Sequence, residues 1–200
     1  MLLARAGLSV LGLDRAREGS DTLSTHALMR AGVLQLHRWG ILAAVQGRGT
    51  PVVRSTSFHY GDETLSIELK PRDGVEGLYA PRRFVLDQIL VDGAREAGAE
   101  IVHGITVTEL MRAGDGRVIG VVAKDTDGTV EVRAGLVIGA DGVRSTVAKL
   151  VGAMPYRTGR HSTAVIFSYF ANLGLDGYHW YYRPNVSVGA IPTNDGLTCV

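Results

Sequence analysis

A chain of 200 residues is long enough to bury a sizeable core, as one large domain or as two small interleaved ones. Its composition, 46% hydrophobic and 20% charged, is ordinary for a globular protein and excludes the disordered class. The net charge of +1 and the lack of a long basic run give no electrostatic case for binding nucleic acid or an anionic membrane. No stretch approaches the roughly twenty consecutive apolar residues of a membrane span.

The single cysteine and the opening segment bear on location. Cys199 has no partner for an intramolecular disulfide, so we expect a reducing, cytoplasmic environment and a buried thiol rather than a nucleophile. The apolar opening carries Arg5 inside its apolar run, and no small-residue cleavage pattern follows it. We therefore do not expect a signal peptide.

The first predicted strand ends in an acid. Residues 1–6 read as the last turns of a helix closed by Gly7, and residues 8–13 read as a short buried strand. Asp14 and then Arg15 follow this strand directly. An acid at a strand end is typical both of a turn and of a ligand site, because ligands of open α/β sheets bind outside the carboxyl ends of strands.

A helical region and a hairpin come next. Apolar spacing in "STHALMRAGVLQLHRWGILAAV" predicts a helix with Ser24 or Thr25 as its N-cap. Gly32 and Gly40 interrupt the pattern, so one helix with a turn and two short helices remain equally open. Alternation around Gly-Asp predicts a β-hairpin over residues 58–70.

The second half predicts one long helix and many strands. A helix begins at Pro81 and is closed by Gly98, and the strand "EIVHG" follows it. The turns "AGDG" and "DTDG" divide residues 105–134 into a three-stranded antiparallel meander. The strand "GLVIGA", residues 135–140, stops at an Asp-Gly pair before a helix, and the alternating tail from 161 to 200 predicts several antiparallel strands.

The histidines suggest little beyond one candidate. His26, beside Thr25, is placed to reach a ligand, although a histidine that only satisfies local hydrogen bonds is the commoner reading of such a position. The others show no metal-like spacing, so we expect no metal site: His37, His59, His103, His161 and His179.

The order of elements resembles that of a known flavoprotein family. A strand ending in an acid, a helix, an excursion, a helix, a strand, a meander and a strand with "GADG" together resemble the FAD-dependent aromatic hydroxylases, the para-hydroxybenzoate hydroxylase group of flavoprotein monooxygenases. "IGADGVRSTV", residues 138–147, looks like the Asp-Gly motif of the family. Arg83, Leu86 and Leu90 match its Arg-x-x-Leu-x-x-x-Leu helix. The resemblance runs over essentially the whole chain.

The resemblance implies an α/β fold: a partial FAD-binding, Rossmann-like domain with a β-meander, plus an antiparallel-sheet substrate domain. We expect the FAD-binding domain over residues 1–48 and 79–152, and the substrate domain over residues 49–78 and 153–200. The Gly-x-Gly-x-x-Gly loop of the family would precede Met1, and its later Gly-Asp motif would follow Val200. On this reading the chain is a fragment, and we expect the 200-residue polypeptide by itself to bind FAD weakly or not at all.

The resemblance also implies which residues touch FAD. Asp14, with Arg15, stands where the family binds the ribose hydroxyls, usually with Glu. Arg30 matches an arginine near the flavin and its phosphates, with a solvated helix arginine as the equal alternative, and Arg83 lies in the diphosphate-contacting helix. Val107 stands where backbone groups hold adenine.

The Asp-Gly motif completes the set of expected contacts. Asp141 and Gly142 are expected to meet the cofactor, although Asp141 read alone is more typical of a cap on the following helix. The motif departs from the family where an expected arginine is Ala148, for which Arg144 is a partial substitute.

The implied activity is that of an NAD(P)H-dependent monooxygenase. FAD reduced by NAD(P)H would react with oxygen, and a small organic substrate, aromatic or not, would be hydroxylated. Catalytic side chains are not identifiable, because the cofactor carries the difficult chemistry. Two alternatives remain: a flavin-dependent reductase or halogenase of the same fold, and a truncated chain without activity.

Overall fold

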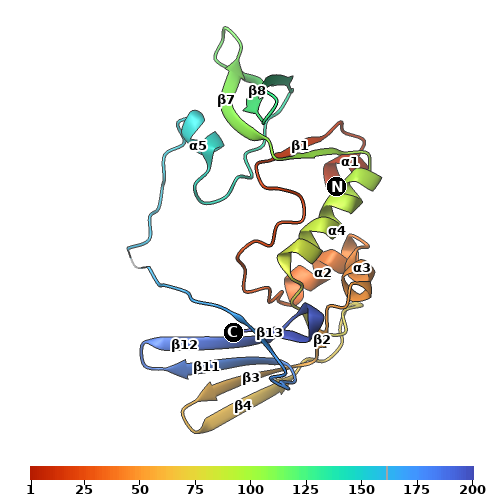
Figure 1. Ribbon diagram of the computed structural model, residues 1–200, viewed down its shortest axis with the longest axis vertical. Coiled ribbons are helices and arrows are strands. Elements are labelled where there is room, and N and C mark those ends of the chain that lie inside the picture. Colours follow the sequence, from red (N-terminus) through yellow and green to blue (C-terminus); the bar gives the residue numbers. More distant parts are fainter. Residues whose placement is uncertain (161) are drawn as a thin grey trace. The chain divides into compact units, whose positions relative to one another are not determined.

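A computed structural model describes residues 1–160 and 162–200 (Figure 1). The chain forms two compact units and crosses between them several times. Unit 1 comprises Met1 with residues 19–96 and 165–200, and unit 2 comprises residues 2–18 and 97–164. The expected domain boundaries follow a different division of the chain and stay a prediction.

Three helices of unit 1 share an apolar core. They are α2 (Arg30–Arg38), α3 (Leu42–Gly47) and α4 (Arg83–Glu96). Their apolar faces bury Val33, Val45 and Ile89, together with Tyr79 from a neighbouring strand. Gly40 has a φ of 77° between α2 and α3, a left-handed conformation that ends α2. Two short helices are therefore the correct alternative for this region.

The predicted N-cap at Ser24 or Thr25 is wrong. Helix α2 begins at Arg30, with Met29 in an extended conformation at its N-cap. The reason is a β-bridge between Leu28 and Tyr79, in which the Leu28 amide donates to the Tyr79 carbonyl at 2.9 Å. This pairing holds the segment before α2 extended.

The sheet of unit 1 has six strands in the order β10-β13-β12-β11-β3-β4 (Figure 1). Hairpin β3–β4 turns at Gly61-Asp62 as predicted. All pairs are antiparallel except β11 with β3, which pair in parallel although about 120 residues separate them. The strands are β3 (Ser55–Tyr60), β4 (Glu63–Glu68), β10 (Tyr169–Ala171), β11 (Tyr178–Arg183), β12 (Val186–Pro192) and β13 (Leu197–Cys199). The predicted tail strands are thus present, and His161 lies outside the described residues.

A second core joins this sheet to a small two-stranded sheet in unit 1. Strands β2 (Val52–Val53) and β5 (Leu78–Tyr79) pair antiparallel. Buried Val53 and Leu78 from this pair contact Tyr178 and Ile191 of the larger sheet. Cys199 is buried in the same cluster, as expected from the sequence.

One buried amide fastens three segments of unit 1. Asn194 is 1% exposed and lies in a 3-10 turn, Asn194–Gly196, between β12 and β13. Its side-chain nitrogen donates to the Arg48 carbonyl at 3.0 Å, and its oxygen accepts from the Arg82 amide at 2.9 Å. The start of α4 and the end of α3 are thereby held to the sheet.

Unit 2 contains a parallel pair and the predicted meander. Strand β1 (Leu11–Asp14) pairs in parallel with β6 (Glu100–His103). The meander has the order β7-β8-β9, formed by β7 (Thr106–Arg112), β8 (Val118–Lys124) and β9 (Thr129–Arg133). Two short helices complete the unit, α1 (Leu2–Arg5) and α5 (Thr146–Leu150). Gly7 closes α1 with a φ of 83°, as predicted.

The predicted strand over residues 135–140 does not form. These residues pair with no strand in the described part of the chain, and Leu136 and Ile138 are 74% and 63% exposed. A strand requires a neighbour that pairs with its backbone groups, and within the described residues β1 and β6 pair only with each other. An apolar run by itself therefore does not determine a strand here.

A membrane-spanning helix is absent from the described residues, because none of their helices is both long and apolar enough.

Candidate functional site

The carboxylate of Asp14 stands at the carboxyl end of the parallel pair in unit 2. Asp14 ends β1 opposite His103, the last residue of β6. Its backbone carbonyl accepts from the Ile105 amide at 3.1 Å, which ties the strand end to the β6–β7 turn. One carboxylate oxygen, Oδ1, accepts from the Ala16 amide at 2.8 Å. The side chain is exposed, so Oδ2 is able to accept from a ligand. Arg15 is exposed beside it.

Val107 lies on the free edge of the meander. Strand β7 is an edge strand, because it pairs only with β8 in the order β7-β8-β9. A bulge interrupts this pairing between Val107 and Glu109. Edge strands and bulges leave backbone groups without a sheet partner, which is the kind of group expected to hold a heterocycle here.

Asp141 caps the helix that follows it. Its Oδ1 accepts from the Ser145 hydroxyl at 2.5 Å, and its Oδ2 accepts from the Thr146 and Val147 amides at 2.6 and 3.1 Å. These hydrogen bonds, the one from Ser145 foremost, lower the pKa of Asp141. Gly142 has a φ of 83°, and no atom lies within 4 Å of where a side chain would start. The capping role of Asp141 is thus observed. The space beside Gly142 is open, so a ligand is able to approach the backbone of this turn.

Arg30 and Arg83 belong to unit 1 and differ in how they are held. Arg30 donates from Nη2 to the Lys70 carbonyl at 2.8 Å, while its buried Nη1 has no hydrogen-bond partner among the described residues. Arg83 forms a two-pronged pair with Asp87 one turn along α4, at 2.9 and 2.8 Å. The hydrogen bonds that Arg83 donates to Asp87 raise the pKa of Arg83. Of these two arginines, Arg30 therefore has a buried donor without a hydrogen-bond partner among the described residues.

Arg82 rather than its neighbour is the centre of a cluster in unit 1. Its Nε donates to Asp21 Oδ2 at 3.1 Å, and its Nη2 pairs with the same oxygen. Its guanidinium lies over the ring of Tyr169, 3.9 Å from the ring centre, and within 5.2 Å of the Phe84 ring centre. Burial works against this charge, but the Asp21 carboxylate outweighs burial and raises the pKa of Arg82.

His26 completes this cluster. It is 3% exposed, and its Nε2 lies 2.6 Å from the Tyr169 hydroxyl oxygen. Its φ of 60° lies in the left-handed region, which few residues other than Gly adopt. Burial lowers the pKa of His26, as do Arg82 and Arg83, while Asp21 opposes them. Its Nδ1 is buried without a partner in the described part of the chain.

The sequence pointed to His26 but missed its three partners. Asp21, Arg82 and Tyr169 come from segments up to about 150 residues apart, and no local motif joins them. The paired arginines of "APRR" were the only available signal, and the motif favoured the second of them. Strained backbone, a buried unpaired nitrogen and shifted pKa values are features that gather at functional sites.

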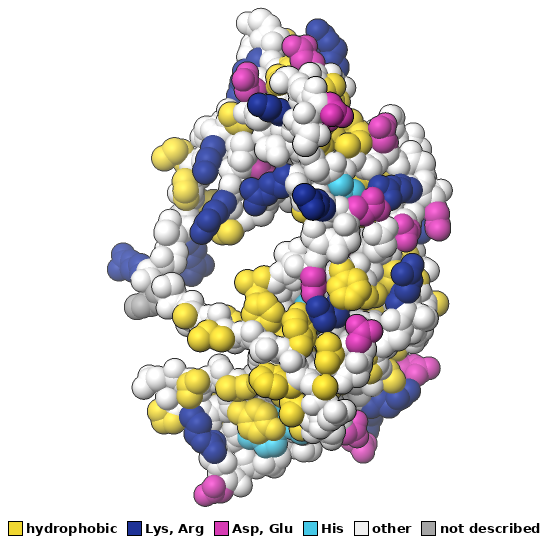
Figure 2. Space-filling model, in the orientation of Figure 1, with side chains coloured by type: hydrophobic (Ala, Val, Ile, Leu, Met, Phe, Trp, Pro, Cys, Tyr) yellow, Lys and Arg dark blue, Asp and Glu magenta, His cyan; other side chains and the backbone are white. Residues whose placement is uncertain are grey.

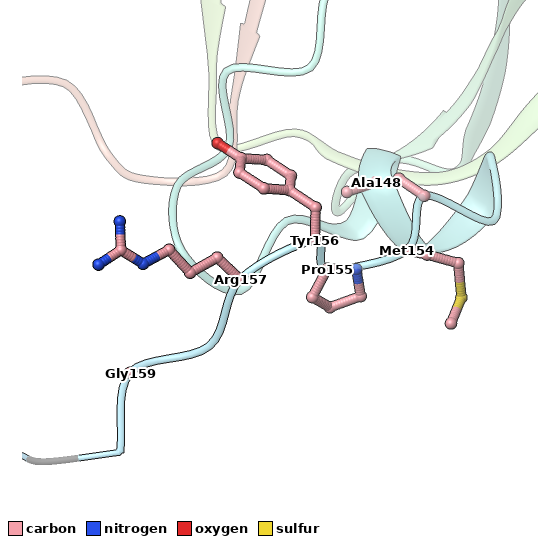
Figure 3. Close-up of a pocket in the computed structure, with 7 residues that line it drawn as sticks. Ala148, Met154, Pro155, Tyr156, Arg157 and Gly159 are labelled. Atoms are coloured by element: carbon pink, nitrogen blue, oxygen red, sulfur yellow. The ribbon is translucent and has the colours of Figure 1, made fainter.

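A shallow hollow in unit 2 contains none of the expected residues. It has a volume of about 600 Å³ and lies beside α5. In Figure 3 the side chains of Met154 and Arg157 project in opposite directions, and Tyr156 points away from both. In small-molecule sites a few polar groups converge on the ligand, whereas the polar groups of this hollow do not converge. The residues that line it are Ala148, Ala153, Met154, Pro155, Tyr156, Arg157 and Gly159.

Curated proteins similar to this chain include a reductase and a hydroxylase. Digeranylgeranylglycerophospholipid reductase 2 of Methanopyrus kandleri is 32% identical over 158 residues, which cover 76% of this chain and 36% of the relative. Aklavinone 12-hydroxylase RdmE of Streptomyces purpurascens is 28% identical over an alignment of 221 positions, gaps included. This alignment covers 97% of this chain and 41% of the relative. The chain therefore spans about two fifths of the length of these relatives.

Solved structures establish the same fold. PqsL of P. aeruginosa, in complex with 2-aminobenzoylacetate, has a TM-score of 0.82 at 20% identity, covering 99% of this chain and 55% of PqsL. p-Nitrophenol 4-monooxygenase PnpA of Pseudomonas putida DLL-E4 has a TM-score of 0.78 at 18% identity, covering 98% of this chain and 52% of PnpA.

The family model described as "FAD binding domain" matches residues 1–196. This match takes in nearly the whole chain and confirms the fold class and the cofactor that the sequence motifs indicated. The protein belongs to the FAD-binding domain family of flavoproteins.

Proposed function

We propose that this chain forms the FAD-binding region and part of the substrate-binding region of an NAD(P)H-dependent monooxygenase. The proposed substrates are oxygen and a small organic molecule. The observation that carries this proposal is the match to the hydroxylase RdmE, which extends over 97% of the chain, whereas the match to the reductase covers 76%. The cytoplasmic location expected from the sequence is part of the same proposal.

The residues of unit 2 fit the ribose and adenine parts of FAD. Asp14 Oδ1 is engaged by the Ala16 amide, but Oδ2 is exposed and is a suitable acceptor for ribose hydroxyls. We propose that Arg15, the exposed cation next to Asp14, contacts the same part of FAD. The unpaired edge of β7 at Val107 supplies backbone groups for adenine. Gly142 allows close approach of a ligand to the Asp-Gly turn, and Asp141 keeps that turn in place by capping α5.

Of the two arginines of unit 1 expected to contact the anionic and flavin parts of FAD, one has a donor that is free among the described residues and the other is already paired. The buried, unpaired Nη1 of Arg30 has the chemistry to donate to an anionic or carbonyl oxygen. Arg83 is neutralised by Asp87, so we assign it an electrostatic and structural role at the start of α4. Bound FAD supplies the electron transfer and oxygen chemistry, while the chain orients the ligand and limits the access of water.

The assignment of Asp14 is tested by titrating the 200-residue chain with FAD and following flavin fluorescence. Asp14→Ala is expected to weaken binding about tenfold, because a hydrogen bond to a charged group contributes ~1.5 kcal/mol. Asp115→Ala is the matched control, since Asp115 also accepts from the amide two residues ahead, at 3.0 Å, but lies in the β7–β8 turn. Equal affinities of the Asp14 variant and the wild type would contradict the assignment.

The reaction is tested with the protein loaded with FAD. A monooxygenase oxidises NADH or NADPH faster when its substrate is present, takes up oxygen, and places one atom of labelled molecular oxygen in the product. A flavin-dependent reductase, which the match to the archaeal enzyme favours, transfers hydride to the substrate without oxygen uptake. Turnover that requires halide would instead identify a halogenase. Either of the last two outcomes would overturn the monooxygenase proposal.

A further inference from the structure

His59 and His179 lie side by side on the six-stranded sheet of unit 1, although 120 residues separate them. His59 is on β3 and His179 is on the parallel neighbour β11. In the register of this pair, His59 lies opposite Tyr181 and His179 lies opposite Ser57, so the two imidazoles are diagonal neighbours on one face. Nε2 of His59 is 3.0 Å from Nδ1 of His179.

The outer nitrogen of each imidazole has its own partner. His179 Nε2 lies 3.2 Å from the Asp176 carbonyl oxygen. A carbonyl only accepts, so Nε2 carries the hydrogen and the lone pair of neutral His179 is on Nδ1, facing His59. His59 Nδ1 lies 2.9 Å from the Thr64 hydroxyl oxygen. A hydroxyl both donates and accepts, so either nitrogen of His59 is able to carry the hydrogen.

We propose that His59 Nε2 and His179 Nδ1 form a binding site for a divalent transition metal ion, a site that is independent of FAD. When the hydrogen of His59 moves to Nδ1, the Thr64 hydroxyl turns to accept it, and both inner nitrogens present lone pairs. No proton is released and no group is oxidised. Metal-bound histidines usually donate their other N–H to a carbonyl, carboxylate or water, and here Asp176 and Thr64 supply these outer acceptors.

The separation of the two inner nitrogens is close to that found in a metal site. Two nitrogens that are each ~2.0–2.1 Å from a tetrahedral metal lie about 3.3 Å apart, close to the 3.0 Å observed. The two rings are within 9° of parallel, and their inner nitrogens face each other, so each ring must turn to aim its lone pair at an ion that lies to one side of the line between the nitrogens. Tyr181 stacks on His59 with ring centres 4.3 Å apart and keeps the plane of His59 defined.

The site is accessible and incomplete. Both histidines are partly exposed, and histidine side chains are visible at the surface of this sheet in Figure 2. No group of three or more His, Cys, Asp or Glu residues positioned to hold a metal occurs in the part of the chain that the structure describes. Water would occupy the other coordination positions, so we expect modest affinity. Imidazole suits Cu²⁺, Ni²⁺ and Zn²⁺, with Cu²⁺ bound most tightly of the three.

The proposal is tested by calorimetric titration of the 200-residue protein with Cu²⁺ and with Zn²⁺. One equivalent of modest affinity is expected for the wild type, and this affinity is expected to fall at least tenfold in His59→Gln and in His179→Gln. His37→Gln, on α2, and Tyr181→Phe, which keeps the ring stack, are expected to bind as the wild type does. Unchanged affinity in both glutamine variants would overturn the proposal.

A second measurement uses the wild type alone, so it does not depend on whether the variants fold. The electron paramagnetic resonance spectrum of the Cu²⁺ complex is expected to show coupling to two imidazole nitrogens. Coupling to one nitrogen, or to none, would overturn the proposal. The metal is also expected to raise the midpoint of thermal unfolding, because it links β3 to β11 only in the folded state.

Discussion

At His26, backbone strain and burial coincide in one residue. A left-handed φ on a residue other than Gly costs about 1–3 kcal/mol, so the surrounding contacts must hold this conformation. The 2.6 Å contact with Tyr169, and the Arg82 guanidinium over the Tyr169 ring, supply such contacts. Because these groups are all within unit 1, we place a conformationally fixed polar cluster there.

The lowered pKa of His26 predicts a pH-dependent stability. Unfolded histidine titrates near pH 6.5, while the folded side chain stays neutral to lower pH because it is buried and near Arg82 and Arg83. Below about pH 6.5 the unfolded state therefore binds more protons, and the free energy of unfolding falls. Urea unfolding of the wild type and of His26→Asn, from about pH 7.5 to about pH 5, measures this effect. Asn tolerates the left-handed backbone and does not titrate, so a parallel pH dependence of the two proteins would refute the prediction.

Two buried tyrosines predict opposite effects of removing a hydroxyl. Tyr178 is 0% exposed, and its hydroxyl has no hydrogen-bond partner among the described residues, so burial raises its pKa strongly. Tyr178→Phe is expected to raise the free energy of unfolding by about 1 kcal/mol, because an unsatisfied buried group is removed.

Tyr79 is 1% exposed, and its hydroxyl lies 2.6 Å from Gln46 Nε2. Tyr79→Phe is therefore expected to lower stability by about 1–2 kcal/mol. Denaturant midpoints test the pair, and equal shifts of one sign would exclude this explanation.

At the scale of elements, Gly77 allows β5 to lie against β2. A side chain at this buried position would begin 2.4 Å from the Val53 carbonyl oxygen, which is backbone and cannot easily move. Gly77→Ala is expected to destabilise unit 1 by about 1–3 kcal/mol through overpacking. Gly47→Ala in α3 is the control, because no atom lies within 4 Å of its added carbon and Ala favours a helix. Thermal unfolding of the two variants should separate them, and similar midpoints would argue against a close approach at Gly77.

Elements set by local chemistry were predictable from the sequence, and elements set by distant partners were not. Turn residues defined the meander and the Gly61-Asp62 hairpin, because the interacting strands are adjacent in the chain. The parallel pairing of β3 with β11 joins segments about 120 residues apart, and no local pattern encodes it. The same distinction explains the site: Asp14 and the Asp-Gly turn were visible as motifs, whereas Tyr169 reaches His26 only through the fold.

At the scale of the molecule, one exposed segment of unit 2, shortly before the chain returns to unit 1, is expected to be sensitive to proteolysis. Residues 153–160 contain no helix or strand, and each is exposed. Proteases cleave most readily where the backbone is exposed and makes few hydrogen bonds. Brief treatment with trypsin, followed by mass spectrometry, is expected to show early cleavage after Arg157. Earlier cleavage after Arg95, in the last turn of α4, would contradict this order of local stability.

The parallel pairing of β3 with β11 also constrains the order of events during protein synthesis. The ribosome adds about 5–20 residues per second, so β3 leaves it on the order of ten seconds before the segment that becomes β11 has been made. During this interval the hairpin β3–β4 exposes an edge with unpaired backbone groups, which is a site for pairing with other nascent chains. The later pairing of β11 with β3 therefore covers an edge that stays open to such pairing while the intervening residues are being made.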